Sequence, residues 1–146
     1  MQFQLDLAAR NATNDANQDV IDIRDCTGQV DSRVSSANSP DVTQAGQALD
    51  AALNAVQNEL YQTKLQAGED PLNFPIKLND KIGALHGVIE SVDGVPTDQT
   101  FQVFDDLNAK LQVQLAKLRD LVATNVASFN QLLQSHGQQP VGCSAV

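Results

Sequence analysis

The feature that most constrains the fold is a stripe of apolar residues near the C-terminus that recur every three or four positions. Such residues lie on one face of an α-helix, so the spacing predicts a long amphipathic helix that buries this face. Thr97 is a good N-cap and Gly137 is typical of a helix end, which places the helix at about residues 97–135. Its stripe consists of Leu111, Leu115, Leu118, Val122, Val126, Phe129 and Leu133, and Phe101, Phe104 and Leu107 extend it upstream.

Three further amphipathic segments precede this helix. A second helix is expected at about 40–67 and a short third helix at about 75–92, each with a proline suited to its first turn. The first segment, at about 2–36, is less regular, because its middle at 11–18 is polar and rich in poor helix formers. We still expect one long helix there. Its apolar positions are Phe3, Leu7, Val20, Ile23, Val30 and Val34.

Four amphipathic helices joined by short turns can bury their stripes only against one another. The sequence therefore predicts an all-α, up-down-up-down four-helix bundle with two long outer helices and two shorter ones, packed in coiled-coil fashion. Residues 1–137 would form the bundle, and residues 138–146 a C-terminal tail. Aromatic residues make up 4% of the chain and Trp is absent, so the core would consist of Leu, Val, Ile and Ala. The predicted core positions are Leu111, Leu115, Leu118, Val122 and Phe129, with Phe74 and Pro75 at the turn.

The charge balance argues against nucleic-acid and membrane partners. The chain has 18 acidic and 9 basic residues, a formal charge of −9, and no Lys/Arg cluster that would provide a local exception. No apolar run approaches the roughly 20 residues that span a bilayer. The opening residues lack the basic and apolar regions of a signal peptide and pass directly into an amphipathic pattern, as expected of a segment of a longer protein.

The chain contains two cysteines, Cys26 and Cys143. Two are too few for a disulfide framework, and their separation matches no zinc-binding spacing. A bridge between them requires the tail to fold back along the first helix. Connectivity does not follow from sequence, so both alternatives stay open, and two unrelated thiols is the favoured one.

No residue pattern indicates catalysis, cofactor binding or metal binding. Neither His86 nor His136 has an acidic residue three or four positions before it, as a helical metal site would need. His136 is better explained as a cation near the negative end of a helix dipole. No glycine-rich phosphate loop and no nucleophile motif occurs. The predicted catalytic, cofactor-binding and metal-binding residues are therefore none.

A series of aspartates on the first helix is the one weak candidate for a cation site. Residues spaced by three and four can share a helix face, but calcium sites usually draw oxygen ligands from a loop that wraps the ion. A solvated acidic face is the favoured interpretation. The residues are Asp15, Asp19, Asp22 and Asp25.

A motif before the third helix carries a family resemblance. It reads DPLNFPIKLNDKI over residues 70–82, and it is followed by the turn DGVPT over residues 93–97. With the long final helix, and with the opening residues 2–5 and 20–24, it resembles the C-terminal helical region of large bacterial Asp-box (sialidase-like, sortilin-like) β-propeller proteins, often labelled glycosyl hydrolases. The resemblance covers nearly the whole chain.

The resemblance implies an exported parent protein, with this chain in the periplasm or outside the cell. The Asp-box repeats are absent from the chain, so a propeller activity would belong to a missing N-terminal portion, and no catalytic residue carries over. We expect a non-catalytic interaction or stabilising domain that packs against its own propeller, a second copy or a partner helix. Three alternatives stay open: a bundle that binds a small apolar ligand, an accessory domain that completes a glycosidase-like propeller site, and a metal-binding module built on the aspartates.

Overall fold

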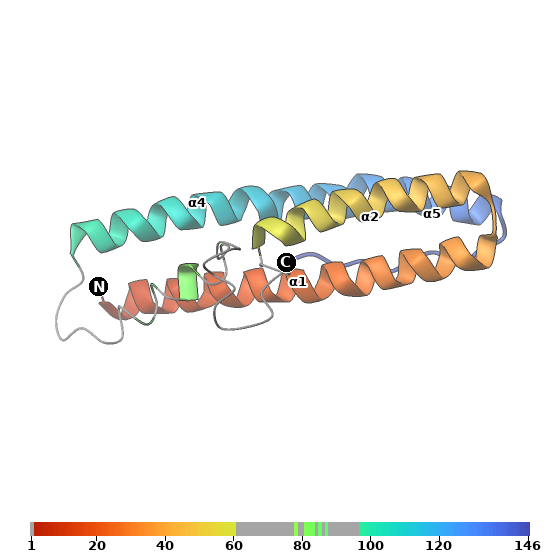
Figure 1. Cartoon of the computed structure of the whole chain (residues 1–146). Coiled ribbons are helices and arrows are strands. Elements are labelled where there is room, and N and C mark those ends of the chain that lie inside the picture. The colour runs from red at the N-terminus through yellow and green to blue at the C-terminus, as the bar shows by residue number, and fades with distance from the viewer. Residues whose placement is uncertain (1, 61–77, 79–80, 84, 86, 88–96) are drawn as a thin grey trace, which may run out of the picture. The chain divides into compact units, whose positions relative to one another are not determined.

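The structure, a computed structural model, describes residues 2–60, 78, 81–83, 85, 87 and 97–146. Within these ranges the chain is helix and connecting loop with no strand, which confirms the all-α class (Figure 1). The up-down arrangement of four helices stays a prediction. The elements are α1 (Gln2–Ala37), α2 (Pro40–Leu60), α4 (Asp98–Asp120), the π-helix η2 (Leu121–Val126) and α5 (Ala127–Ser135).

The third predicted helix falls mostly outside the described residues. Residues 81–83 are helical and Ile82 is fully buried, in agreement with a helix at 75–92. His86 and the turn residues Phe74 and Pro75 lie outside the described part of the chain, as does most of the motif at 70–82. The predicted end of the second helix, at residue 67, lies there too.

The polar segment at 11–18 is helical throughout, so α1 is continuous as predicted. The buried positions in and beside this segment are the alanines Ala9, Ala12 and Ala16, which are at most 6% exposed. They recur at spacings of three and four and so lie on one face of the helix. The polar residues between them take the other faces. The prediction that Leu7 belongs to the buried stripe is wrong, since Leu7 is 39% exposed and Leu5 is buried instead.

The chain divides into two compact units. Unit 1 comprises residues 1–18 and 58–114, and unit 2 comprises residues 19–57 and 115–146. The described core of unit 1 includes Leu5, Ala9, Leu60, Ile82, Phe104 and Leu111. The core of unit 2 includes Ile23, Val30, Leu53, Leu115, Leu118, Phe129 and Leu133.

In unit 2, a short turn joins α1 to α2 and a glycine lets the two helices approach. Asn38 adopts a left-handed conformation with φ 46°, and its N–H donates to the carbonyl of Val34 at 3.2 Å. A side-chain carbon at Gly46 would collide with Val34 and would lie 3.3 Å from Val30. A larger residue at position 46 would therefore require the Val34 side chain or the helices to shift.

The final helix has the predicted bounds. Thr97 is its N-cap, since its hydroxyl accepts the N–H of Thr100 at 3.3 Å. At the other end Gly137 adopts φ 72°, and the N–H of Gln138 donates to the carbonyl of Leu133 at 2.9 Å, which is the expected glycine cap. The helix is interrupted by η2, which the sequence did not predict.

The predicted core of this helix is confirmed with one exception. Leu111, Leu115, Leu118 and Phe129 are at most 3% exposed. Val122 is only half-buried, because the wider π-turn begins at the preceding residue and shifts the buried face to Val126.

The last nine residues, 138–146, form a strap that folds back along α1 within unit 2 (Figure 1). A disulfide joins Cys26 of α1 to Cys143 of the strap, with 5.0 Å between their Cα atoms. The favoured alternative of two unrelated thiols is therefore wrong. The strap brings a further apolar side chain, Val141, into the core of unit 2.

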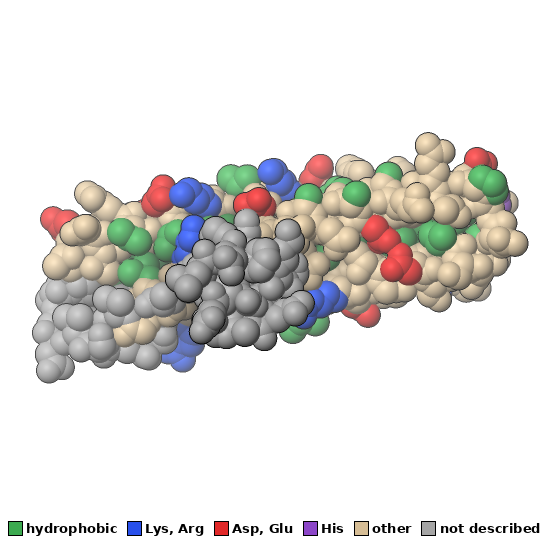
Figure 2. Space-filling view, in the orientation of Figure 1, with side chains coloured by type: hydrophobic (Ala, Val, Ile, Leu, Met, Phe, Trp, Pro, Cys, Tyr) green, Lys and Arg blue, Asp and Glu red, His purple; other side chains and the backbone are tan. Residues whose placement is uncertain are grey.

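None of the described helices is long and apolar enough to cross a membrane. On the face drawn in Figure 2, charged side chains are spread among uncharged polar ones, and apolar side chains reach the surface in small separate groups.

Candidate functional site

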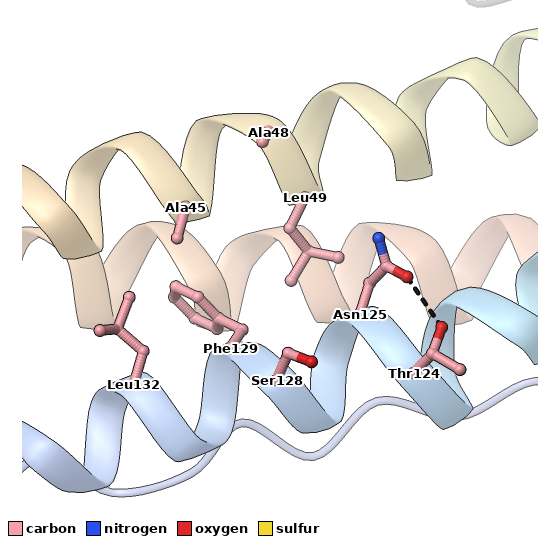
Figure 3. A pocket seen from close by; sticks show the side chains of 8 residues that line it. All are labelled: Ala45, Ala48, Leu49, Thr124, Asn125, Ser128, Phe129 and Leu132. Carbon is pink, nitrogen blue, oxygen red and sulfur yellow. Dashed lines mark hydrogen bonds between the residues drawn. The ribbon is translucent and has the colours of Figure 1, made fainter.

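An open groove of about 380 Å³ lies in unit 2 between α2 and the η2–α5 segment. Figure 3 shows how the side chains from the two walls face each other across it. Leu49 and Phe129 are buried and form its apolar floor. The lining residues are Ala45, Ala48, Leu49, Thr124, Asn125, Ser128, Phe129 and Leu132.

The walls of the groove are rows of positions on two helices. Ala45, Ala48 and Leu49 lie three and four apart on α2, and Asn125, Ser128 and Leu132 follow the same spacing on the opposite wall. The α2 wall has two alanines, whose small side chains leave the space that the groove occupies. A groove of this kind suits an apolar side chain row or a compact apolar molecule.

The π-helix supplies two of the lining residues. The Thr124 hydroxyl lies 2.7 Å from the carbonyl oxygen of Asp120 and 2.8 Å from Oδ1 of Asn125 (Figure 3). Both are acceptors, so the hydroxyl proton is held within the helix. A π-turn is costly compared with an α-turn and often marks a functional site.

The side chains that line the groove are uncharged. One of its walls lies on α2, whose charged residues are all acidic. None of the eight lining side chains is ionisable. The α2 helix contains Asp41, Asp50 and Glu59 but neither Lys nor Arg, and residues 121–135 contain no charged residue. The lining therefore offers no ionisable side chain for acid–base catalysis, and none that could activate the hydroxyls of Thr124 and Ser128 as nucleophiles.

Asp50 is a described group with a strongly raised pKa. It lies on α2 next to the groove floor, half-buried, and interacts with Asp31 of α1. Desolvation, a hydrogen bond with Asp31 and repulsion from the Asp31 charge together raise the pKa of Asp50 to about 7. The second oxygen of Asp50, Oδ1, is buried without a hydrogen bond. The protonated form of Asp50 is therefore favoured as pH falls below neutral.

The aspartates of α1 do not form the solvated face that the sequence predicted. Asp19 is fully buried, and its Oδ1 accepts the backbone N–H of Val146 at 2.8 Å. Asp25 is exposed and accepts the side-chain N–H of Gln29 at 2.8 Å. Among the described residues, no three His, Cys, Asp or Glu side chains come together in a way that could hold a metal ion.

His136 lies where the sequence placed it, at the C-terminal end of a helix. It is the C-cap residue of α5, and its backbone N–H donates to the carbonyl of Leu133 at 3.0 Å. Its side chain is exposed and lies outside the groove lining. His136 therefore belongs to the helix end and not to the candidate site.

Comparison with protein families, characterised proteins and solved structures found no match. The resemblance to propeller-associated domains thus depends on the sequence alone, and its most specific part, the motif at 70–82, lies mostly outside the described residues.

Proposed function

We propose that this chain is a non-catalytic helical interaction domain, and that the groove between α2 and η2–α5 is its docking surface. The observation that carries the proposal is the groove itself: an apolar floor between two helical rows with small side chains on one wall. Amphipathic helices commonly bind by laying one apolar face into such a groove.

The partner we propose is an amphipathic helix with Lys or Arg beside its apolar face. The α2 helix has no base and carries Asp41, Glu59 and Asp50, the last only partly ionised at neutral pH because its pKa is about 7, and the whole chain has a formal charge of −9. Basic residues beside the partner's apolar face would be attracted by the negative charge of this chain. An acidic helix or a second copy of this chain would be repelled. Association should then weaken as ionic strength rises.

We further propose that the chain works in an oxidising compartment, as part of an exported protein. The Cys26–Cys143 bridge supports this, because disulfides persist in the periplasm and outside the cell and are rare in the cytosol. A propeller-containing parent, suggested by the motif at 70–82, is compatible with that location.

A second candidate function is the binding of a small apolar molecule. The groove volume of about 380 Å³ lies within the range of small-molecule sites, and Ala45 and Ala48 thin the packing around it. A small ligand would bind without dependence on ionic strength, which distinguishes it from a basic helix.

Two tryptophan variants on one helix test the docking surface. Ala48 lines the groove, whereas Ala51 is also exposed on α2 but lies outside the lining. Ala48→Trp should fill the groove and weaken binding of a synthetic Leu/Lys amphipathic helical peptide about tenfold, a loss of about 1.4 kcal/mol. Ala51→Trp should bind the peptide as the unmodified chain does. Equal affinities for all three proteins would show that the peptide binds through charge alone and would refute the groove.

A further inference from the structure

Two side-chain amides of unit 2 bind the backbone of the strap in the same way, each by donating one hydrogen bond and accepting another. Asn130 of α5 donates to the carbonyl of Val141 at 3.1 Å and accepts the N–H of the same residue at 2.8 Å. Gln29 of α1 does the same with Gly142, at 2.9 Å and 2.8 Å. Two consecutive residues of the strap are therefore each bound through both their backbone N–H and their carbonyl, from two different helices.

Further contacts continue this pattern to both ends of the strap. Arg33 donates to the carbonyl of Gln139 at 2.9 Å. At the other end, Asp19 accepts the N–H of Val146 at 2.8 Å and Arg119 donates to its carbonyl at 3.0 Å. All of these bonds are made to backbone atoms, so they recognise an extended chain whatever its sequence.

The spacing of these contacts on α1 matches an extended peptide. From residue 33 to residue 19 the helix covers about 21 Å, at 1.5 Å per residue. From residue 139 to residue 146 an extended chain covers about 23 Å, at about 3.3 Å per residue. The strap therefore runs antiparallel to α1 without slack, and the polar row on this helix is in register with it.

Only a few positions of the strap restrict which side chain can stand there. Val141 is 4% exposed and anchors the strap in the core of unit 2. A side-chain carbon at Gly142 would meet only Oε1 of Gln29 at 3.9 Å, which is ordinary contact, so other small residues fit there. Cys143 adds the covalent bond to Cys26.

We propose that the surface of α1 and α5 beneath the strap is a peptide-binding groove, which we call the strap groove. Its ligand is an extended peptide with a small β-branched apolar residue at the Val141 position, and residues 138–146 occupy it as a resident ligand. This site is distinct from the docking groove on α2, and the proposal does not depend on the proposed function.

Reduction of the disulfide by an added dithiol opens the strap groove in vitro. Cys143 is partly exposed and Cys26 is 1% exposed, so the thiolate of a dithiol reductant attacks the sulfur of Cys143. The Cys26 sulfur leaves as a thiolate and takes up a proton. The second thiol of the reductant then forms its own disulfide and releases Cys143 as a thiol. The strap is then held only by hydrogen bonds and Val141, and a competing peptide can replace it.

A full-length variant with a disabled strap tests the strap groove. Val141→Asp, Gly142→Pro and Cys143→Ser remove the anchor, one backbone donor and the bridge. A labelled synthetic peptide of residues 138–146, with serine at position 143, should bind this variant saturably in fluorescence anisotropy and should not bind the oxidised unmodified chain. Adding Asn130→Leu should weaken binding about tenfold, whereas Gln134→Leu, at an exposed position of α5, should not.

Two results would overturn the proposal: no saturable binding by a disabled-strap variant that keeps its helical circular dichroism, or equal binding with and without Asn130→Leu. If that variant does not fold, the unmodified chain still gives an answer. It is equilibrated in a thiol–disulfide buffer with the cysteine-containing peptide or a scrambled peptide, and the adducts at Cys26 are counted by mass spectrometry. We expect about tenfold more adduct with the matching peptide. Equal amounts would rule out the strap groove.

Discussion

The disulfide between α1 and the strap should be the largest single contribution of one bond to the stability of this chain. It joins residues 117 positions apart and so closes a very long loop. In the chain-entropy treatment such a link removes about 16 cal/mol/K from the unfolded chain, which corresponds to about 5 kcal/mol at room temperature. Residual structure in the unfolded chain lowers this figure, so we expect a loss of about 2–5 kcal/mol on reduction.

Urea unfolding of the same protein with and without a thiol reductant measures this loss directly. The helical circular dichroism signal should survive reduction in the absence of urea, because α1, α2 and α5 keep their buried leucines and valines. The midpoint should move to lower urea concentration. A Cys26→Ala, Cys143→Ala double variant is the control, and its midpoint should not respond to reductant. If reduction lowers the free energy of unfolding of the unmodified chain by less than about 1 kcal/mol, the view that the bridge restrains the unfolded state is refuted.

Two further predictions concern the core and the carboxyl pair. Leu115→Ala should lower the free energy of unfolding by about 2–5 kcal/mol, because Leu115 is 2% exposed and its truncation leaves a cavity, and an unchanged melting temperature would contradict its place in the core. Asp50 has a raised pKa in the folded chain, so the folded state binds more protons than the unfolded state between about pH 4 and pH 7, and the stability contributed by this group falls as pH rises through that window. Discounted for solvent screening, the free energy of unfolding should fall by about 1 kcal/mol across this window, and Asp50→Asn should remove this fall. If the free energy of unfolding depends on pH in the same way for both proteins, the raised pKa of Asp50 is contradicted.

The helices could be predicted because their signals are local. Spacings of three and four, Thr97 as N-cap and Gly137 as C-cap depend on residues within a few positions of one another. The bounds of α1 and of the final helix agree with the prediction within two residues. The close approach at Gly46 also follows from local reasoning, since a missing side chain leaves space.

The π-helix could not be predicted from the stripe. Leu107, Leu111 and Leu115 follow one another at the same two successive spacings of four as Leu118, Val122 and Val126. The first set lies within the regular α-helix α4, whereas the second runs into η2 at residues 121–126. The spacing alone therefore does not distinguish a π-turn from an α-turn.

The strap and the buried aspartate could not be predicted, because their partners are far apart in the sequence. Gln29 and Gly142 are separated by 113 positions, and Asp19 and Val146 by 127. Nothing near Asp19 distinguishes it from the exposed Asp25, so both appeared to belong to one solvated face. Only the path of the strap determines which aspartate is covered.

The central claim is that the groove beside Ala48 docks a basic amphipathic helix, and isothermal titration with the Leu/Lys peptide tests it most directly. The account predicts saturable binding to the unmodified chain and to Ala51→Trp, about tenfold weaker binding to Ala48→Trp, and weaker binding at higher salt for all three. Binding that is absent, or that is unaffected by Ala48→Trp, would contradict the claim.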